Sequence, residues 1–375
     1  MDCKFLKHGV AFTYDHIVRP CCEWTQDPAW DQQNHISQVD LKNWHESPQV
    51  IQLRQQLDQG IWPSGCQRCA VLENQGRQDS LRGNGHSAYA DYTGQDITLE
   101  IRPGSVCNFA CQTCWPAASS RVAQYHHQAG LVDIKTVKNT PIDNFDFLLP
   151  ITDRIRTVIL LGGEPFYDPS CKKFLTWAAE NLRADITMFT NGSHVDWAWV
   201  DSYPGQITMV FSIDAIGAAA EYVRFGTDWP VVNNNFIRAQ QHPRIELRVN
   251  VTMSVYNYHL IEEVIEFLIP QWPKVVSFGV PTRLNLRHLT EISTPMENRQ
   301  QIIASLERAV DHVLSSNIEK GQQHNAVNAI RSVIANLSDN NFEQLQFDKL
   351  KQIVTKLDQV KRINIVSSNN PVNFS

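Results

Sequence analysis

The chain has 375 residues, 42% of them hydrophobic and 19% charged, which suits one large domain with an appendage or two to three domains. No apolar run approaches the roughly 20 residues that a membrane helix requires, so we expect a soluble protein and no membrane partner. A formal net charge of -6 argues against a general nucleic-acid binder.

Cysteines dominate the first third of the chain, since eight of the nine lie within the first 114 residues. The N-terminus lacks an apolar stretch followed by a small-residue cleavage site, so we expect a cytoplasmic protein. In that compartment, this many cysteines indicates metal or redox chemistry rather than disulfides.

Residues 1–95 form the first predicted unit, which is rich in Gln, Asn, Asp and Trp and has few long apolar runs. A short hairpin-like segment is followed by a predicted helix from Leu41 to Leu57, where apolar residues recur at helical spacing. The Trp and amide side chains of this unit are either an ordinary solvated surface or the lining of a polar groove that binds an extended peptide backbone.

Four cysteines of this unit make up one possible metal site: Cys3, Cys21, Cys66 and Cys69. Cys22 is an alternative to Cys21, and four thiolates suit either a structural zinc ion or an iron-sulfur cluster. The arrangement resembles the auxiliary-cluster domain called twitch or SPASM, through the segments Asp15 to Cys21, Asn43-Trp44, Leu53-Arg54 and Cys66-x2-Cys69. It departs from that family at His16, where a glycine is usual. The resemblance implies a second [4Fe-4S] cluster here.

The motif Cys107-Asn-Phe-Ala-Cys111-Gln-Thr-Cys114 places three thiols within eight residues, directly after a strand-like run. A structural zinc site closes its shell with four ligands, whereas three thiolates around an iron-sulfur cube leave one iron open to a small molecule. The spacing C-x3-C-x2-C resembles that of the radical S-adenosylmethionine (radical SAM) enzymes. The resemblance implies that Cys107, Cys111 and Cys114 hold a [4Fe-4S] cluster whose open iron binds S-adenosylmethionine.

Residues 96–290 read as repeated strand-then-helix units, the pattern of parallel strands joined by crossover helices. Polar residues or glycine follow each of six predicted strands: 97–101, 156–161, 186–190, 207–213, 245–251 and 275–280. A helix is predicted from Cys171 to Leu182, with Cys171 as a small buried hydrophobe. The expected fold class is α/β, a partial (β/α)6 TIM-like barrel with its site at the C-terminal strand ends, a small N-terminal cysteine-rich domain and a helical C-terminal extension.

Polar motifs at these strand ends match the radical SAM family in order and spacing. The expected cofactor-binding residues are Gly162, Gly163, Glu164, Pro165, Asn191, Ser212, Asp214, Arg224 and Asn250. The resemblance assigns the GGEP motif to the amino group of the cofactor, Ser212 and Asp214 to its ribose, and Arg224 to its carboxylate. Taken singly, these residues also suit a turn, a helix cap or a solvated side chain.

An aromatic residue commonly precedes the third cysteine in this family and packs on the adenine. Thr113 stands at that position here. We therefore expect Phe109 or Trp115 to provide the aromatic contact.

Residues 291–375 are predicted to be mainly helical and to carry no chemistry. Thr294-Pro-Met-Glu297 is typical of a helix start with a capping Thr. The segment Leu357-Asp-Gln-Val-Lys-Arg362 resembles a C-terminal segment of phage and bacterial twitch-containing proteins, without a function that follows from it. The tail after Ser367 is expected to be loose.

The reaction implied by the resemblance is one-electron cleavage of S-adenosylmethionine, after which a 5′-deoxyadenosyl radical abstracts hydrogen from the substrate. An electron donor such as flavodoxin or ferredoxin is implied as a partner. Because relatives with this auxiliary domain often modify peptides or proteins, we expect a peptide or protein substrate. A small metabolite is the alternative, and a non-catalytic zinc or iron-sulfur accessory protein is the alternative of another class.

Overall fold

The computed structural model describes residues 2–25, 27–74, 80–83, 91–137, 139–273, 275–279, 288–290, 293–339 and 342–361. The chain divides into two compact units. The first unit comprises Met1–Ser105, Lys138–Met188 and Ala198–Ile207, and the second comprises Val106–Val137, Phe189–Trp197 and Thr208–Ser375.

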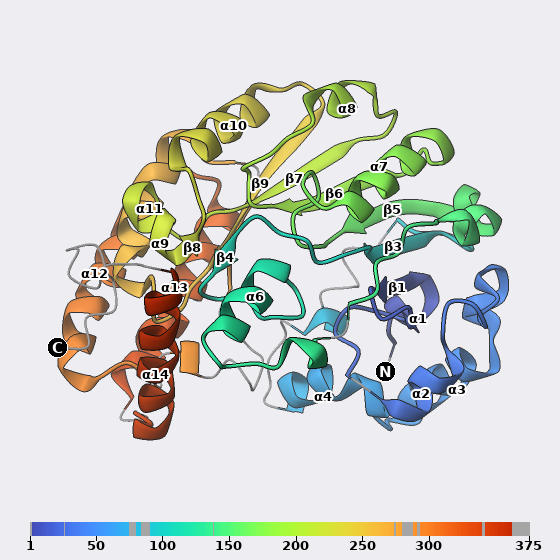
Figure 1. Cartoon of the computed structure of the whole chain (residues 1–375), viewed down its shortest axis with the longest axis horizontal. Coiled ribbons are helices and arrows are strands. Elements are labelled where there is room, and N and C mark those ends of the chain that lie inside the picture. The colour runs from blue at the N-terminus through green and yellow to red at the C-terminus, as the bar shows by residue number, and fades with distance from the viewer. Residues whose placement is uncertain are drawn as a thin grey trace. The chain divides into compact units, whose positions relative to one another are not determined.

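Most strands belong to one eight-stranded sheet, in the order β10-β9-β7-β6-β5-β3-β1-β2 (Figure 1). Their bounds are β1 Gly9–Thr13, β2 Val18–Arg19, β3 Ile97–Arg102, β5 Ile155–Leu160, β6 Asp185–Thr190, β7 Ile207–Ser212, β9 Ile245–Thr252 and β10 Val275–Gly279. β1, β3, β5 and β6 pair in parallel, as do β9 and β10, while β2 is antiparallel to β1. The fold is therefore mixed α/β with a mostly parallel sheet, and all six predicted strands are present.

The first unit adds two strands to those predicted, because β1 pairs with β3 over the register Gly9↔Thr98 to Thr13↔Arg102. The helices that begin in this unit are α1 Phe5–His8, α2 Pro28–Gln33, η1 Leu41–Glu46, α3 Pro48–Asp58, η2 Ser64–Cys66, α4 Gln67–Asn74, η4 Asp146–Arg154 and α7 Pro169–Asn181. α8, Trp197–Ser202, begins with Trp197, which belongs to the second unit, and its other residues belong to the first unit. An aspartate or serine side chain caps α2, α3 and α7, and a proline occupies their first turn.

The single helix predicted from Leu41 to Leu57 is wrong, because the chain forms two helices there, η1 and α3. The apolar residues at helical spacing are all buried, as expected. Between the two helices, Ser47 is extended and its hydroxyl accepts from Val50 N at 3.4 Å, and Pro48 opens α3. Proline cannot continue a preceding helix, so the apolar periodicity spans a break that the proline marks.

Three tryptophans of the first unit, Trp24, Trp30 and Trp44, lie in its core. Trp24 and Trp30 have ring centroids 4.6 Å apart, and Trp30 meets Trp44 edge-on at 5.8 Å. The exposed fractions of the three side chains are 7%, 8% and 1%. These three indoles therefore form an aromatic core for a segment with few long apolar runs and do not line a groove, whereas Trp62 is half-buried.

The second unit contains a two-stranded sheet, β4 Ala110–Cys111 with β8 Arg224–Phe225, besides its strands of the large sheet. Its helices are α6 Ser120–Gln128, η3 Ile134–Thr136, α9 Gly217–Val223, α10 Trp229–Gln241, η5 Tyr258–Leu260, α11 Ile261–Leu268, η6 Ile269–Gln271, α12 Met296–Ser315, α13 Lys320–Ser338 and α14 Gln344–Lys361. α12 packs on α11 and α13, and α14 packs on α6 (Figure 1). The helical character expected for the C-terminal region is confirmed.

The start of α12 differs from the prediction. Pro295 occupies the N-cap position, and no side chain caps the helix there. Thr294 is buried, and its hydroxyl has no hydrogen-bond partner among the described residues. Thr294 therefore does not cap this helix, although Leu306, Val310 and Val313 are buried along one face as expected.

None of the helices in the described part of the chain has both the length and the hydropathy that a bilayer span requires. The end of the strand expected at 275–280, Arg362 and the tail after Ser367 lie outside the described residues. The domain boundaries expected at residues 95 and 290 remain predictions.

Candidate functional site

The cysteine loop of the second unit, residues 107–114, is held by the N-terminus of α6. Cys107 N donates to Ser120 Oγ (3.3 Å), Arg121 Nη1 donates to the carbonyl of Asn108 (2.5 Å), and Ser119 Oγ donates to the carbonyl of Phe109 (3.0 Å). Cys107 Sγ also accepts from the backbone N–H of Phe109 (3.4 Å). The loop backbone is therefore fixed by side chains of the helix that follows it.

Cys107, Cys111 and Cys114 are all half-buried, and none forms a disulfide. The sequence of the second unit contains no cysteine besides these three. A thiol that is held on an ordered loop and forms no disulfide is available as a metal ligand.

Arg224 lies directly opposite Cys111, because β4 and β8 pair through Cys111↔Arg224 and Ala110↔Phe225. Arg224 Nη1 contacts Asp214 Oδ2 at 2.7 Å, and the side chains of this pair are 13% and 1% exposed. The other oxygen of Asp214 accepts from Thr252 N at 2.7 Å. Both carboxylate oxygens of Asp214 thus have partners within the protein, and Oδ2 holds the Arg224 guanidinium beside the cysteine loop.

The electrostatics of the Cys111 and Arg224 pair are coupled. Burial raises the pKa of the Cys111 thiol, and the Arg224 and Lys361 cations oppose that shift. Burial lowers the pKa of Arg224, but the Cys111 and Asp214 groups outweigh it, and the net shift is upward. Arg224 Nε is buried and has no hydrogen-bond partner in the described part of the chain. A donor left in this state fits an anionic group bound at the cysteine loop.

Asn191, predicted as a cofactor contact, lies against the first cysteine. Its Nδ2 donates to Asn108 Oδ1 at 3.0 Å and lies 3.9 Å from Cys107 Sγ. Asn108 Nδ2 in turn donates to Ser193 Oγ at 2.9 Å. This amide chain orients the residue that follows Cys107, and the sequence analysis missed Asn108.

Ser212 and Asn250, two further predicted contacts, lie near the C-terminal ends of β7 and β9, which are neighbours in the sheet. Both are partly exposed. Ile213 N donates to the carbonyl of Asn250 at 3.0 Å, which fixes the two strand ends together. Their side chains are therefore accessible to a ligand, in contrast to the fully engaged carboxylate of Asp214.

Phe109 and Trp115 differ in exposure. Phe109 is 1% exposed and packs within the protein, whereas Trp115 is half-buried. Trp115 thus has the more accessible ring of the two for stacking on a base.

The motif Gly162 to Pro165 belongs to the first unit, where it follows β5. A Cβ added at Gly162 would lie 2.8 Å from the sulfur of Cys171, so the close approach of the buried Cys171 requires glycine there. Glu164 is 1% exposed, and its carbonyl accepts from Asp168 N at 2.8 Å in the turn that leads to α7. Cys171 is fully buried, which agrees with its predicted packing role.

The four N-terminal cysteines lie together in the first unit. Cys3 precedes α1, Cys21 follows β2, Cys66 ends η2 and Cys69 lies in α4, and all four line one cavity with Arg82. Burial raises the pKa of each thiol, to about 12 for Cys66, and neighbouring thiols add to the shift for Cys3, Cys21 and Cys66, whereas Glu73 and Glu23 add to it for Cys69. Thiols in this environment stay protonated unless a bound cation lowers their pKa.

Cys22 points elsewhere. It is exposed, it is not among the residues that line the cavity, and it lies within hydrogen-bonding reach of Glu100. Of the two alternatives that the sequence left open, Cys21 is the one that lies with Cys3, Cys66 and Cys69.

The spacing of the sulfurs bears on the choice between zinc and a cluster. Four thiolates about 2.3 Å from a tetrahedral zinc ion lie about 3.8 Å from one another. Among the described residues, one group of three potential ligands has its atoms mutually within 4.8 Å, namely Glu262, Glu266 and His312. Glu262 is already paired with Arg308 at 2.7 Å. Among the described residues, no three cysteine sulfurs lie mutually within 4.8 Å.

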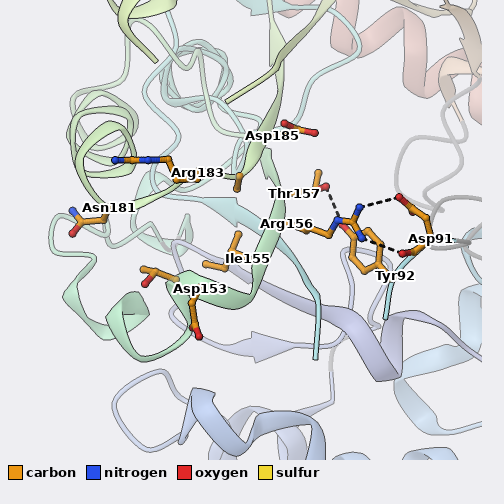
Figure 2. Close-up of a pocket in the computed structure, with 11 residues that line it drawn as sticks. Asp91, Tyr92, Asp153, Ile155, Arg156, Thr157, Asn181, Arg183 and Asp185 are labelled. Carbon is orange, nitrogen blue, oxygen red and sulfur yellow. Dashed lines mark hydrogen bonds and ion pairs between the residues drawn. The ribbon is translucent and has the colours of Figure 1, made fainter. Parts of the chain in front are cut away.

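A separate polar pocket of about 680 Å³ lies in the first unit at the N-terminal ends of β5 and β6 (Figure 2). Its Arg156 is engaged by Asp91 at 3.0 Å and by Asp96 at 3.2 Å, and it lies over the ring of Tyr92. Ligand sites of parallel α/β sheets lie at the opposite, C-terminal strand ends. This pocket therefore does not coincide with any predicted site residue.

Lys361, the last described residue of α14, also lies against the cysteine loop, and the sequence analysis missed it. Its Nζ donates to the carbonyl of Ala110 and to Gln112 Oε1, both at 3.1 Å, and lies 5.0 Å from the ring centroid of Phe225. Burial lowers the pKa of Lys361 to about 8, against the raising effects of Cys111 and Asp358, so it is mainly protonated at neutral pH. The resemblance of the segment 357–362 to other proteins pointed to this part of the chain, but it did not indicate that Lys361 lies against the cysteine loop.

No family model matches the chain, and a search of curated proteins finds no match. Among solved structures, anSMEcpe with bound AdoMet and a peptide is similar at 14% identity and a TM-score of 0.38, covering 58% of this chain and 60% of that one. Streptococcus suis SuiB bound to the precursor peptide SuiA is similar at 15% identity and a TM-score of 0.36, covering 80% and 67%. TYW1 with a lysine-pyruvate adduct is similar at 12% identity and a TM-score of 0.35, covering 61% and 78%.

The chain thus spans about three fifths of the length of anSMEcpe. At these identities and TM-scores, the similarities assign neither a family nor a function to the chain.

Proposed function

We propose that this chain is a radical SAM enzyme in which Cys107, Cys111 and Cys114 hold a [4Fe-4S] cluster that binds S-adenosylmethionine at its open iron. The observation that carries the proposal is the donor set: three half-buried thiols on one ordered loop, no other cysteine in that unit, and a buried guanidinium opposite Cys111. When bound, the cluster and S-adenosylmethionine supply one-electron reduction and hydrogen abstraction from a substrate.

The residues around the loop would orient these groups. Asn191 donates toward Cys107, and the N–H of Phe109 donates to the same sulfur, and both contacts favour a thiolate. Asp214 holds Arg224 so that its unpartnered Nε is available to an anionic group. Arg224 is thereby suited to the carboxylate of S-adenosylmethionine, with Asp214 as the residue that positions it.

The remaining cofactor contacts are proposals that rest on the family resemblance: Phe109, Gly162, Gly163, Glu164, Pro165, Ser212 and Asn250. A contact between Asp214 and ribose stays a prediction too, and it requires Asp214 to exchange one of its two protein partners. The partial (β/α)6 barrel at residues 96–290, flanked by an auxiliary domain and a helical extension, belongs to the same proposal.

We also propose that Cys3, Cys21, Cys66 and Cys69 hold a second [4Fe-4S] cluster. The support is the shared cavity that all four cysteines line. A cluster with four protein ligands has no open iron, so its role would be electron transfer or shaping of the substrate site.

The substrate is proposed to be a peptide or a protein, with a small metabolite as the alternative. This follows from the resemblance of the N-terminal segment to auxiliary-cluster domains. Because Trp24, Trp30 and Trp44 are buried, they do not contribute to a peptide groove, and the amide side chains of the same segment are the remaining feature that favours one. A flavodoxin or ferredoxin in the cytoplasm would be the electron donor.

The test is anaerobic reconstitution followed by reduction with dithionite in the presence of S-adenosylmethionine. Wild type is expected to release 5′-deoxyadenosine and to bind about eight iron atoms per chain. Changing Cys107, Cys111 or Cys114 to Ala should abolish the release and remove about half of the iron, whereas the matched variant Cys171→Ala should keep both.

Two further variants address the N-terminal site. Cys21→Ala should remove the other half of the iron, and Cys22→Ala should not. Zinc without labile sulfide in the wild-type protein would instead favour a non-catalytic accessory protein, and cofactor cleavage by the Cys107, Cys111 and Cys114 triple variant would refute the central assignment.

A further inference from the structure

The C-terminal helix α14 brings a buried positive charge to the cysteine loop from a distant part of the sequence. Lys361 is separated by 251 residues from Ala110, whose carbonyl accepts its hydrogen bond. The acceptors Ala110 and Gln112 flank Cys111 on both sides. A single ammonium group therefore binds the backbone carbonyl before the middle cysteine and the side-chain amide of the residue after it.

The charge of Lys361 is not neutralised by a direct ion pair. Its two hydrogen-bond acceptors are a carbonyl and an amide oxygen, and no carboxylate in the described part of the chain lies within ion-pairing distance of Nζ. Asp358, one turn earlier on α14, raises the pKa of Lys361 through its charge but accepts from Tyr222 OH at 3.4 Å through Oδ2. Its Oδ1 is buried and has no hydrogen-bond partner among the described residues. The other cation at the loop, Arg224, has its own counter-ion in Asp214.

A buried ammonium group with only neutral acceptors is unfavourable unless a further anion lies nearby. An iron-sulfur cluster held by three thiolates carries negative charge, and it gains one more negative charge on reduction. A fixed positive charge beside it stabilises the reduced form more than the oxidised form.

We propose that Lys361 is a positioning residue of the cluster site, which fixes the backbone around Cys111 and raises the reduction potential of the cluster held by Cys107, Cys111 and Cys114. This inference rests on the proposed function, because it requires a cluster on those thiols. It assigns α14, and with it the segment 357–361, to the site of electron uptake.

The test compares full-length variants, each reconstituted without oxygen and titrated with a reductant while the cluster is followed by electron paramagnetic resonance. The signal that changes on addition of S-adenosylmethionine identifies the cluster with the open iron. Lys361→Met removes the charge at similar side-chain length, Lys361→Arg retains the charge, and Lys351→Met changes an exposed lysine of the same helix as the control.

We expect Lys361→Met to bind as much iron as wild type but to show at least a tenfold lower ratio of reduced to oxidised cluster at any fixed potential, which equals about 59 mV for a one-electron couple. Lys361→Arg should recover most of this loss, and Lys351→Met should match wild type. If Lys361 only held the loop in place, the reduction potential of the cluster would not follow the charge of the side chain at position 361 in this order.

An unchanged potential in Lys361→Met, with iron content intact, would overturn the inference. If that variant fails to take up iron, Lys361→Gln replaces it, because its amide still donates to the Ala110 carbonyl without the charge. The same tenfold criterion then applies, and a wild-type potential in Lys361→Gln would overturn the inference. A wild-type protein that takes up no iron at Cys107, Cys111 and Cys114 would overturn the proposed function itself, and this inference with it.

Discussion

Replacing Asp214 by Ala should destabilise the protein strongly, because it leaves Arg224 buried without its counter-ion. The Asp214 side chain is 1% exposed, its contact with Arg224 is 2.7 Å long, and its second oxygen satisfies Thr252 N. Removing one partner of such a buried pair costs about 3–5 kcal/mol of the free energy of unfolding. Lys173→Ala is the matched control, since its ion pair with Asp143 is more than half exposed and should contribute less than about 1 kcal/mol.

The assay is urea unfolding of the reconstituted proteins followed by tryptophan fluorescence, with the midpoint and slope fitted for each variant. Asp214→Asn should fall between wild type and Asp214→Ala, because its amide oxygen can still accept from Thr252 N while the charge is lost. A loss in Asp214→Ala no larger than that in Lys173→Ala would refute the reasoning. It would mean that the guanidinium finds water or another acceptor once the carboxylate is gone.

Two other predictions concern the first unit. Burial lowers the pKa of His45 to about 4, below its value in the unfolded chain, so the unfolded state binds more protons between pH 6.5 and 4 and stability should fall as the pH drops through that window. The shift is worth about 3 kcal/mol, and His45→Gln, which keeps a donor for the Gly9 carbonyl, should flatten that part of a pH–stability curve. Gly65→Ala should remove about half of the iron measured after reconstitution, because a Cβ there would lie 2.1 Å from the Trp24 ring, and we expect relief of this clash to shift the loop that carries Cys66. Iron content equal to wild type would show that the loop adjusts without moving its cysteine.

The strands could be read from the sequence because each is a local pattern. β7 is buried at five consecutive positions, and β9 alternates buried and half-buried residues, as a central strand and a one-sided strand should. Pro48 is a sequence signal for the break between η1 and α3. The apolar residues keep helical spacing on both sides of it, and that periodicity led to the prediction of a single helix. The burial of Trp24, Trp30 and Trp44 could not be read from the sequence, since composition records how many tryptophans are present and not which of them pack together.

The candidate site was predictable only in part. Its cysteines are close together in sequence, and its polar residues occur at regular intervals after predicted strands. Both sets can therefore be identified from motif spacing. Lys361 is different, because nothing local distinguishes a lysine on an amphipathic helix from its solvated neighbours until the helix is placed on α6. The choice between Cys21 and Cys22 likewise could not be made from the sequence, because both residues are cysteines. It depends on which of the two adjacent side chains after β2 faces the cavity.

The hydrogen bond from Lys361 to Ala110 also has a consequence for biosynthesis. During translation, the thiols of residues 107–114 leave the ribosome long before α14 has been made. For that interval the loop lacks the hydrogen bond from Lys361 to the Ala110 carbonyl in β4. A cluster loaded then would enter a looser and more oxygen-accessible loop than the finished protein offers. Loading of the proposed cluster should therefore follow completion of α14.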